Sequence, residues 1–219
     1  MPGADRLPTP PELPGERNAV EAVALEPEAS FAEIELTSAS LAGEVAKDVA
    51  IKASRLSAVD ISGAELEQLW LSNCELRGCN LANLQAPRAR LERTALLDGR
   101  LTGTILTEAK LSDVTFRGCR VDLASFAVCE LARVTFEDCL LAQSDFLEAR
   151  LTDVRFHGCE LARADFRGAR LERCEFRRSD LAGLQGVAGL RGADLELPYI
   201  VELATVWAAE LGIGVLDDG

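Results

Sequence analysis

The chain has 219 residues, 48% of them hydrophobic, and a formal net charge of −13 at pH 7. This size and composition suit one folded domain with a continuous core. The charge argues against a protein that neutralises nucleic-acid phosphates, so we expect no direct nucleic-acid binding. The acidic excess lies near the ends, because residues 61–180 carry 19 acidic and 17 basic side chains whereas residues 1–60 carry 11 and 5.

Proline and acidic residues dominate the first thirty residues. Six of the eight prolines lie there with six acidic residues, and no apolar periodicity is visible. No basic start is followed by an apolar run, so we predict neither a signal peptide nor a transmembrane segment, and no membrane partner. We expect residues 1–30 to form a disordered, acidic, proline-rich tail.

A large apolar residue recurs at every fifth position from Leu91 to Leu181. An amphipathic helix repeats near 3.6 residues and a half-buried strand alternates at 2, so a period of five fits neither element. Strict short repetition is typical of a solenoid, in which each unit packs on its neighbours. A small residue, such as Val114, Cys119 or Ala124, precedes each large one by two positions, so we expect large and small side chains to alternate in the core.

Phenylalanine occupies alternate large positions, which gives this core a period of ten residues. A coil with four sides and about twenty residues satisfies this period, because it stacks Phe on Phe along two faces and Leu on Leu along the other two. Stacked rings would then lie about 4.8 Å apart, the spacing of neighbouring strands. The members of this core ladder are Phe116, Phe126, Phe136, Phe146, Phe156, Phe166 and Phe176.

Two segments carry a family resemblance. The runs Ala164-Asp165-Phe166-Arg167-Gly168 and Ala193-Asp194-Leu195 resemble the A(D/N)LXX unit of pentapeptide-repeat proteins. The resemblance implies an all-β solenoid, a right-handed quadrilateral β-helix, which we place at residues 31–195. It also implies a protein-binding role, since members of one branch resemble B-form DNA, bind DNA gyrase and confer quinolone resistance. Loops interrupt the coil in the plasmid-borne quinolone-resistance proteins, and this chain has no comparable insertion.

The repeat is irregular where it starts. Ala46 occupies a large position and Glu44 the small position before it. Because a buried carboxylate is costly without a partner, we expect a loosened or bulged first coil. The large and small positions are also exchanged at Leu84 and Ala86, but no residue is inserted there.

The cysteines occupy the small inward register. Their spacings match no zinc site, and we interpret them as small buried side chains, with a disulfide or thiolate-metal ladder as the alternative. Their odd number and the lack of an export signal indicate a reducing, cytoplasmic location. We therefore expect no metal and no cofactor. The seven are Cys74, Cys79, Cys119, Cys129, Cys139, Cys159 and Cys174.

A helix is predicted in residues 196–219. Pro198 can open it, and apolar residues follow at helical spacing. We expect this helix to cap the open end of the solenoid, because exposed core and strand edge invite association. The resemblance also suggests that it forms a homodimer. The residues that we expect in the cap or the dimer are Ile200, Leu203, Trp207 and Leu211.

No catalytic constellation is visible. His157 is the only histidine, and its register faces solvent. No nucleophile with a base, no acid pair and no phosphate-binding loop stands out. We therefore predict that the protein is not an enzyme.

Binding to a protein is the function that we expect, and two versions stay open. In the first, the protein is a DNA mimic that binds DNA gyrase or topoisomerase IV and modulates them or protects them from inhibitors. In the second, the solenoid is a rigid interaction scaffold with no topoisomerase role, and a minor third class is metal or redox chemistry at the cysteines. One face combines acidic residues with the apolar Ile105, Val128 and Leu147. The acidic candidates for partner binding are Glu108, Asp145, Glu148 and Asp165.

Overall fold

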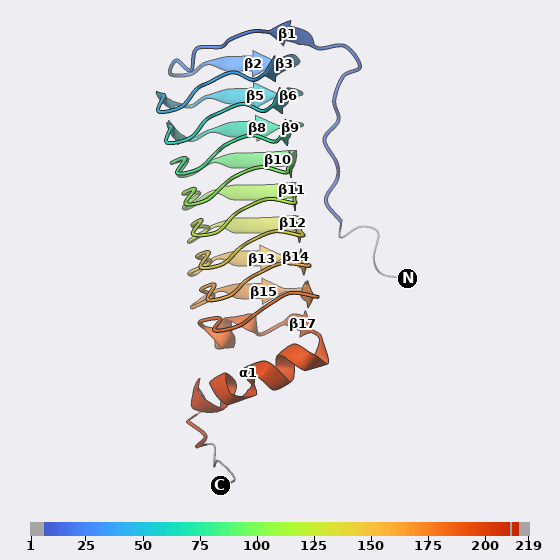
Figure 1. The fold of residues 1–219 in the computed structure, drawn as a ribbon, viewed down its shortest axis with the longest axis vertical. Helices are drawn as coiled ribbons and strands as arrows, with labels where there is room; N and C mark the ends of the chain where they lie inside the picture. Colours follow the sequence, from blue (N-terminus) through green and yellow to red (C-terminus); the bar gives the residue numbers. More distant parts are fainter. Residues whose placement is uncertain (1–6, 211, 215–219) are drawn as a thin grey trace.

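The chain winds into a right-handed, four-sided parallel β-helix with a helix packed under its last coil (Figure 1). The computed structural model describes residues 7–210 and 212–214. Between residues 30 and 177, strands of successive coils pair in parallel at an offset of 20 residues, as in Leu91↔Leu111↔Leu131. This is the four-sided coil that the phenylalanine period predicts.

The four sides of a coil are named by their inward central residues. Face 1 is centred on residues 31, 51 and so on to 171, face 2 on 36 to 176, face 3 on 41 to 181 and face 4 on 46 to 186. Each face meets the next at a corner residue two positions after the centre. Most corner residues, such as Asp113 with a φ of 58°, have left-handed backbone geometry that turns the chain.

Faces 1 and 2 hold most of the regular strands. Three long strands run over both faces without interruption: β10 (Arg90–Leu97), β11 (Lys110–Arg117) and β12 (Glu130–Glu137). The shorter strands on face 1 are β2 (Ser30–Ala32), β5 (Ala50–Lys52), β8 (Trp70–Ser72), β13 (Arg150–Thr152) and β15 (Arg170–Glu172). Those on face 2 are β1 (Asn18–Val20), β3 (Ile34–Thr37), β6 (Arg55–Ser57), β9 (Glu75–Arg77), β14 (Arg155–His157), β16 (Cys174–Arg177) and β17 (Ala193–Leu195).

Faces 3 and 4 are held together by single bridges between coils, such as Ser125↔Asp145. The exception on face 4 is the pair β4 (Val45–Lys47) and β7 (Glu65–Glu67). Backbone hydrogen bonds nevertheless continue from coil to coil on these faces, for example from the Phe126 N–H to the Asp145 carbonyl at 2.7 Å. All four faces therefore stay in one twenty-residue register.

Two columns of phenylalanine rings fill the lower core. On face 2, Phe116, Phe136 and Phe156 stack nearly parallel with centroids 4.7 and 5.1 Å apart. On face 4, Phe126 and Phe146 stack at 5.0 Å. Rings of different columns meet edge to face at 5.7–6.3 Å, so both favourable aromatic geometries occur in one core.

The prediction of a loosened or bulged first coil was wrong. Ala46 is buried and pairs with Leu66 in the regular register, and the two neighbouring pairs are equally in step. Glu44 is exposed although it occupies an inward position. At this end of the solenoid the small position opens to solvent, so the carboxylate keeps its hydration without a distorted backbone.

The start of the solenoid also lies earlier than residue 31. β1 pairs with β3 through Asn18↔Ile34, an offset of 16 residues instead of 20. Leu25 is buried in the core cluster between them. A shortened coil therefore forms from a segment that shows no five-residue period, because backbone pairing to β3 does not require the repeat.

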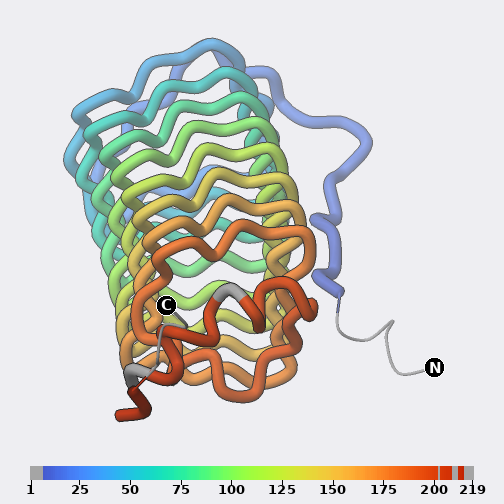
Figure 2. Tube along the Cα trace, turned by 60° about the horizontal axis from the view of Figure 1, so that its bottom comes forward, coloured from blue at the N-terminus to red at the C-terminus, as the bar shows by residue number. Residues whose placement is uncertain are grey.

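The C-terminal end is closed by two helical elements. The 3-10 helix η2 (Val187–Leu190) buries Val187 and Leu190 under the last coil. Below it lies α1 (Leu197–Glu210), whose Leu203 is buried in the same core cluster (Figures 1 and 2). In the part of the chain that the structure describes, no helix is long and apolar enough to cross a membrane.

Candidate protein-binding face

The exposed large apolar side chains of the described coils gather on face 4 and its corners. Val45, Ile105, Leu123 and Val128 are 66%, 39%, 56% and 49% exposed. Isolated exposed apolar residues are common, but residues grouped on one side of a rod point to an interaction surface. Ile105, Leu123 and Val128, which lie on adjacent coils, are called the apolar patch below.

The repeat explains the shape of the apolar patch. Leu123 and Val128 occupy the two corners of face 4, one on each side of the buried Phe126, and each has a φ of 60°. Ile105 lies one coil earlier on the same face, because it bridges to Ser125. The repeat usually places polar residues or glycine at such corners, so the two apolar corner residues broaden the surface that face 4 offers.

The four acidic candidates surround this patch. Asp145 and Asp165 lie on face 4 in successive coils and are joined by a bridge. Glu108 and Glu148 occupy the same corner column as Val128, one coil before it and one coil after it, and both are exposed. The structure thus brings the four candidates to one side of the rod.

Hydrogen bonds hold two of these carboxylates in place. Asp145 accepts hydrogen bonds from the Leu147 N–H at 2.8 Å and from the Ser125 hydroxyl at 3.2 Å. Asp165 accepts from the Arg167 guanidinium at 2.5 Å, and this hydrogen bond keeps the pKa of Asp165 below its usual value. Arg167 also compensates the charge of Asp165, so this residue adds less to the acidic potential than Asp145.

The acidic residues do not form an unbroken stripe. Of the 21 outward positions of face 4 and its Val128 corner column between residues 45 and 168, seven are acidic and three are basic. Two of the bases pair with Glu67 and one with Asp165. Duplex DNA of the same length, about 34 Å for seven coils, carries about 20 negative charges. The face is therefore moderately acidic and partly apolar.

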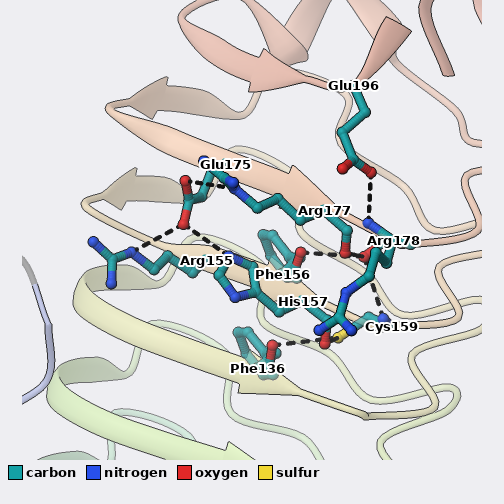
Figure 3. Close-up of polar contacts among 10 residues, drawn as sticks. Phe136, Arg155, Phe156, His157, Cys159, Glu175, Arg177, Arg178 and Glu196 are labelled. Carbon is teal, nitrogen blue, oxygen red and sulfur yellow. Dashed lines mark hydrogen bonds and ion pairs between the residues drawn. The ribbon is translucent and has the colours of Figure 1, made fainter. Parts of the chain in front are cut away.

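The only histidine belongs to an ion-pair cluster on face 2 (Figure 3). The His157 Nε2 lies 2.7 Å from Glu175 Oε1, and the guanidinium groups of Arg155 and Arg177 each lie 3.2 Å from the same carboxylate. Burial raises the pKa of Glu175, but the His157 hydrogen bond and the nearby cations outweigh it and leave the pKa below its usual value. A carboxylate shared by three basic groups holds neighbouring coils together.

Substitution of Glu175 by glutamine should lower the free energy of unfolding by about 1–2 kcal/mol at pH 7. Because the pKa of Glu175 is lowered on folding, its contribution is present above the unfolded value near 4.3 and is lost as the pH falls through the folded value. Urea unfolding of both proteins from pH 7 to pH 3 measures the difference. A difference that does not shrink on acidification would contradict this account.

The cysteine side chains lie in the core of the described part of the chain, and a side-chain hydrogen bond with Cys139 lowers the pKa of Cys159. All seven are free thiols and buried, and burial raises the pKa of Cys74 to about 11 and of Cys129 to about 12. Cys119, Cys139 and Cys159 stack in one column, where the Cys159 thiol lies 3.4 Å from the Phe136 carbonyl oxygen. Among residues 7–210 and 212–214 no group of three or more Cys, His, Asp or Glu side chains has metal-binding geometry.

The cap residues divide between core and surface. Leu203 is buried and Trp207 is half-buried, and both pack on the core under η2, whereas Ile200 is 40% exposed. Leu211 lies outside the described residues. Leu197 and Val201 are 71% and 68% exposed, so α1 also presents an apolar surface to solvent.

Sequence analysis did not single out Leu123, the most exposed member of the apolar patch. One feature of the sequence could have indicated it. Leu123 lies two positions after the centre Val121, at a corner where the other coils have Gly, Asn, Gln or Arg. The ordered corner between faces 1 and 2 was also not found, because the spacing of its residues does not show that the N-terminal segment donates hydrogen bonds to it.

The profile of the pentapeptide repeat region matches residues 70–146 and 118–185. The chain belongs to the pentapeptide-repeat family. None of the curated proteins is significantly similar to it in sequence. Among solved structures, it is similar to HetL, a pentapeptide repeat protein involved in heterocyst differentiation regulation from the cyanobacterium Nostoc sp. strain PCC 7120. The two are 24% identical over 82% of this chain and 90% of HetL, with a TM-score of 0.47.

A second similar structure is that of trypsin-treated QnrB1, a plasmid-mediated fluoroquinolone resistance protein. It is 16% identical over 86% of this chain and all of the QnrB1 chain, with a TM-score of 0.45. At these levels the similarity extends to the repeat fold alone. The surface of this pentapeptide-repeat protein must therefore be interpreted from its own residues.

Proposed function

We propose that this pentapeptide-repeat protein is a non-enzymatic scaffold that binds a partner protein through face 4. The observation that carries the proposal is the gathering of the exposed coil hydrophobics Ile105, Leu123 and Val128 on one side of the rod. Apolar side chains surrounded by charged ones are typical of protein interfaces, where the centre is desolvated and the rim stays wet.

The surrounding charges define the chemistry of the partner. Asp145 and Glu148 border the apolar patch on its later side and Glu108 on its earlier side. A groove beside it is lined by Val128, Glu148 and Arg150. The surface therefore fits an apolar protrusion bordered by basic residues, and complementary charge would steer its approach.

A narrower version of the proposal names a type II topoisomerase as the partner. The family resemblance suggests DNA gyrase or topoisomerase IV, with the acidic side of the rod in place of DNA and a homodimer formed through the exposed residues of α1. The net charge of −13 supports an acidic mimic. The interrupted acidic rows favour the general scaffold, so we place the topoisomerase role second. In both versions the protein acts in the cytoplasm.

The apolar patch is tested by the double substitution Leu123→Ser and Val128→Ser. Both side chains are about half exposed, so the fold should persist while capture of partners by the immobilised protein drops at least tenfold. Leu140→Ser, at an outward position on face 3, is the matched control. Equal recovery of the same partners by all three proteins, measured by quantitative mass spectrometry, would refute the use of face 4.

The topoisomerase version is tested by a supercoiling assay with the host's gyrase and topoisomerase IV. Inhibition at micromolar protein, lost after Asp145→Lys and Glu148→Lys, would support it. No effect on either enzyme, with or without a fluoroquinolone, would exclude a topoisomerase role and leave the scaffold proposal to the capture experiment.

A further inference from the structure

The first described residues run along the outside of the solenoid instead of projecting from its end. From β1 the chain descends beside the coils, along the corner between faces 1 and 2 (Figures 1 and 2). The Thr9 N–H donates a hydrogen bond to Asp113 Oδ1 at 3.0 Å, and the Glu12 N–H donates to Asn73 Oδ1 at 3.2 Å. These two acceptors lie two coils apart, so the segment crosses the coils at a steep angle.

The acceptors belong to an ordered column of corner residues, which we call the corner rail: Asn73, Arg93, Asp113 and Arg133. Each acceptor is held by an arginine from the next coil. Arg93 Nε donates to Asn73 Oδ1 at 2.9 Å, and Arg133 donates two hydrogen bonds to Asp113 at 2.8 and 2.7 Å. The acceptor oxygens are therefore positioned by the solenoid itself, and each still accepts an N–H from outside.

Burial in the N-terminal segment follows a period of three. Pro8, Pro11 and Pro14 are half-buried, whereas Thr9, Pro10 and Glu12 are exposed; Leu13, next to Pro14, is half-buried in addition. A period of three is that of the polyproline II helix, the conformation that proline-rich chains adopt without internal hydrogen bonds. The segment thus packs one proline per turn against the corner. The N–H groups of Thr9 and Glu12, which have no partner within a polyproline II helix, donate to the acceptors of the rail.

The dimensions of the two partners agree. Three residues of a polyproline II helix rise about 9.3 Å, and two coils of a β-solenoid span about 9.6 Å. Thr9 and Glu12 are three residues apart, and their acceptors Asp113 and Asn73 are two coils apart. One turn of the peptide therefore matches one period of the rail, whereas three residues of an α-helix rise only about 4.5 Å. An extended strand has a similar rise but alternates its buried side chains at every second residue, so the spacing of Pro8, Pro11 and Pro14 favours polyproline II.

We propose that the corner rail is a binding site for a proline-rich peptide in the polyproline II conformation, and that residues 8–14 occupy it as an intramolecular ligand. The partner that fits is a proline-rich segment of another protein with two N–H groups three residues apart. This site lies across the rod from the apolar patch of face 4, so it does not depend on the function proposed above. A free peptide must displace residues 8–14, whose attachment to the same chain gives them a high effective concentration.

The test uses the full chain with Thr9→Pro and Glu12→Pro. These substitutions remove both N–H donors and keep the extended preference of the segment. An acetylated, amidated peptide with the sequence of residues 7–15 is titrated into this variant and into the wild type, and NMR follows the Nε–H signals of Arg93 and Arg133. We expect the peptide to shift these signals and to bind the variant at least tenfold more tightly than the wild type.

Two controls separate recognition from unspecific contact. The same peptide with proline at the positions of Thr9 and Glu12 has no matching N–H groups and should not bind. Asn73→Ala and Asp113→Ala in the variant should abolish binding, whereas Asp98→Ala at the corner between faces 2 and 3 should not. The proposal is overturned if neither protein binds the peptide, if both bind it equally, or if the all-proline peptide binds as well.

Discussion

Replacing Phe146 by alanine should lower the free energy of unfolding by about 3–5 kcal/mol. Its ring is fully buried, lies between Phe126 and Phe166 with centroids 5.0 and 4.8 Å away, and meets the rings of Phe136 and Phe156 edge to face. The parallel coils above and below are fixed by backbone hydrogen bonds, so the cavity cannot collapse and both the transfer and the cavity cost apply.

Urea unfolding followed by circular dichroism measures this loss. Phe146→Leu is the matched control, because it keeps most of the apolar volume and should cost no more than about half as much. A loss below about 1 kcal/mol for the alanine variant would show that the ring columns contribute little to the stability of the solenoid.

Replacing Gly186 by alanine should destabilise the C-terminal end by about 2–4 kcal/mol. Gly186 has a φ of 69°, and a β-carbon there would lie 2.4 Å from the Arg167 nitrogen and 2.6 Å from its α-carbon. Because both are backbone atoms of the coil above, η2 or that coil must move. The seating of η2 and α1 under the last coil should therefore loosen.

Gly183→Ala is the control that isolates the clash. Gly183 has a similar φ of 65°, but the nearest atom to a β-carbon there is Cγ of Arg163 at 3.5 Å, an ordinary contact. The free energy of unfolding of this variant should fall by only about 1 kcal/mol, the cost of placing a residue with a β-carbon in left-handed backbone geometry. Hydrogen exchange in β16 and β17 reports the C-terminal end directly, and equal protection in the two variants would contradict the clash.

The fold itself was readable from the sequence. A period of five residues, with phenylalanine at alternate centres from Phe116 to Phe176, permits one arrangement in which identical residues stack, namely four sides and twenty residues per coil. Every coil buries side chains at the same inward positions. One small residue at a large position, such as Ala46, therefore does not change the register. The acidic candidates could also be assigned to a common side, since residues 20 apart must line up.

The ends and the surface depended on tertiary structure. Residues 18–20 join the solenoid by backbone pairing, and backbone hydrogen bonds leave no trace in a side-chain pattern. Glu44 avoids burial because the first coils are open to solvent, which periodicity cannot show. The apolar patch forms because Leu123 and Val128 sit at corners of one coil next to Ile105 of another.

The sequence by itself determined the coil, because its core repeats at a period that only this geometry can bury. Only the tertiary structure decided where the N-terminal segment lies. Its prolines predict an extended conformation but name no partner, and the acceptors of Thr9 and Glu12 stand 104 and 61 residues further along the chain. Winding at twenty residues per coil brings Asn73 and Asp113 into one column, and their distance along it happens to equal one polyproline turn.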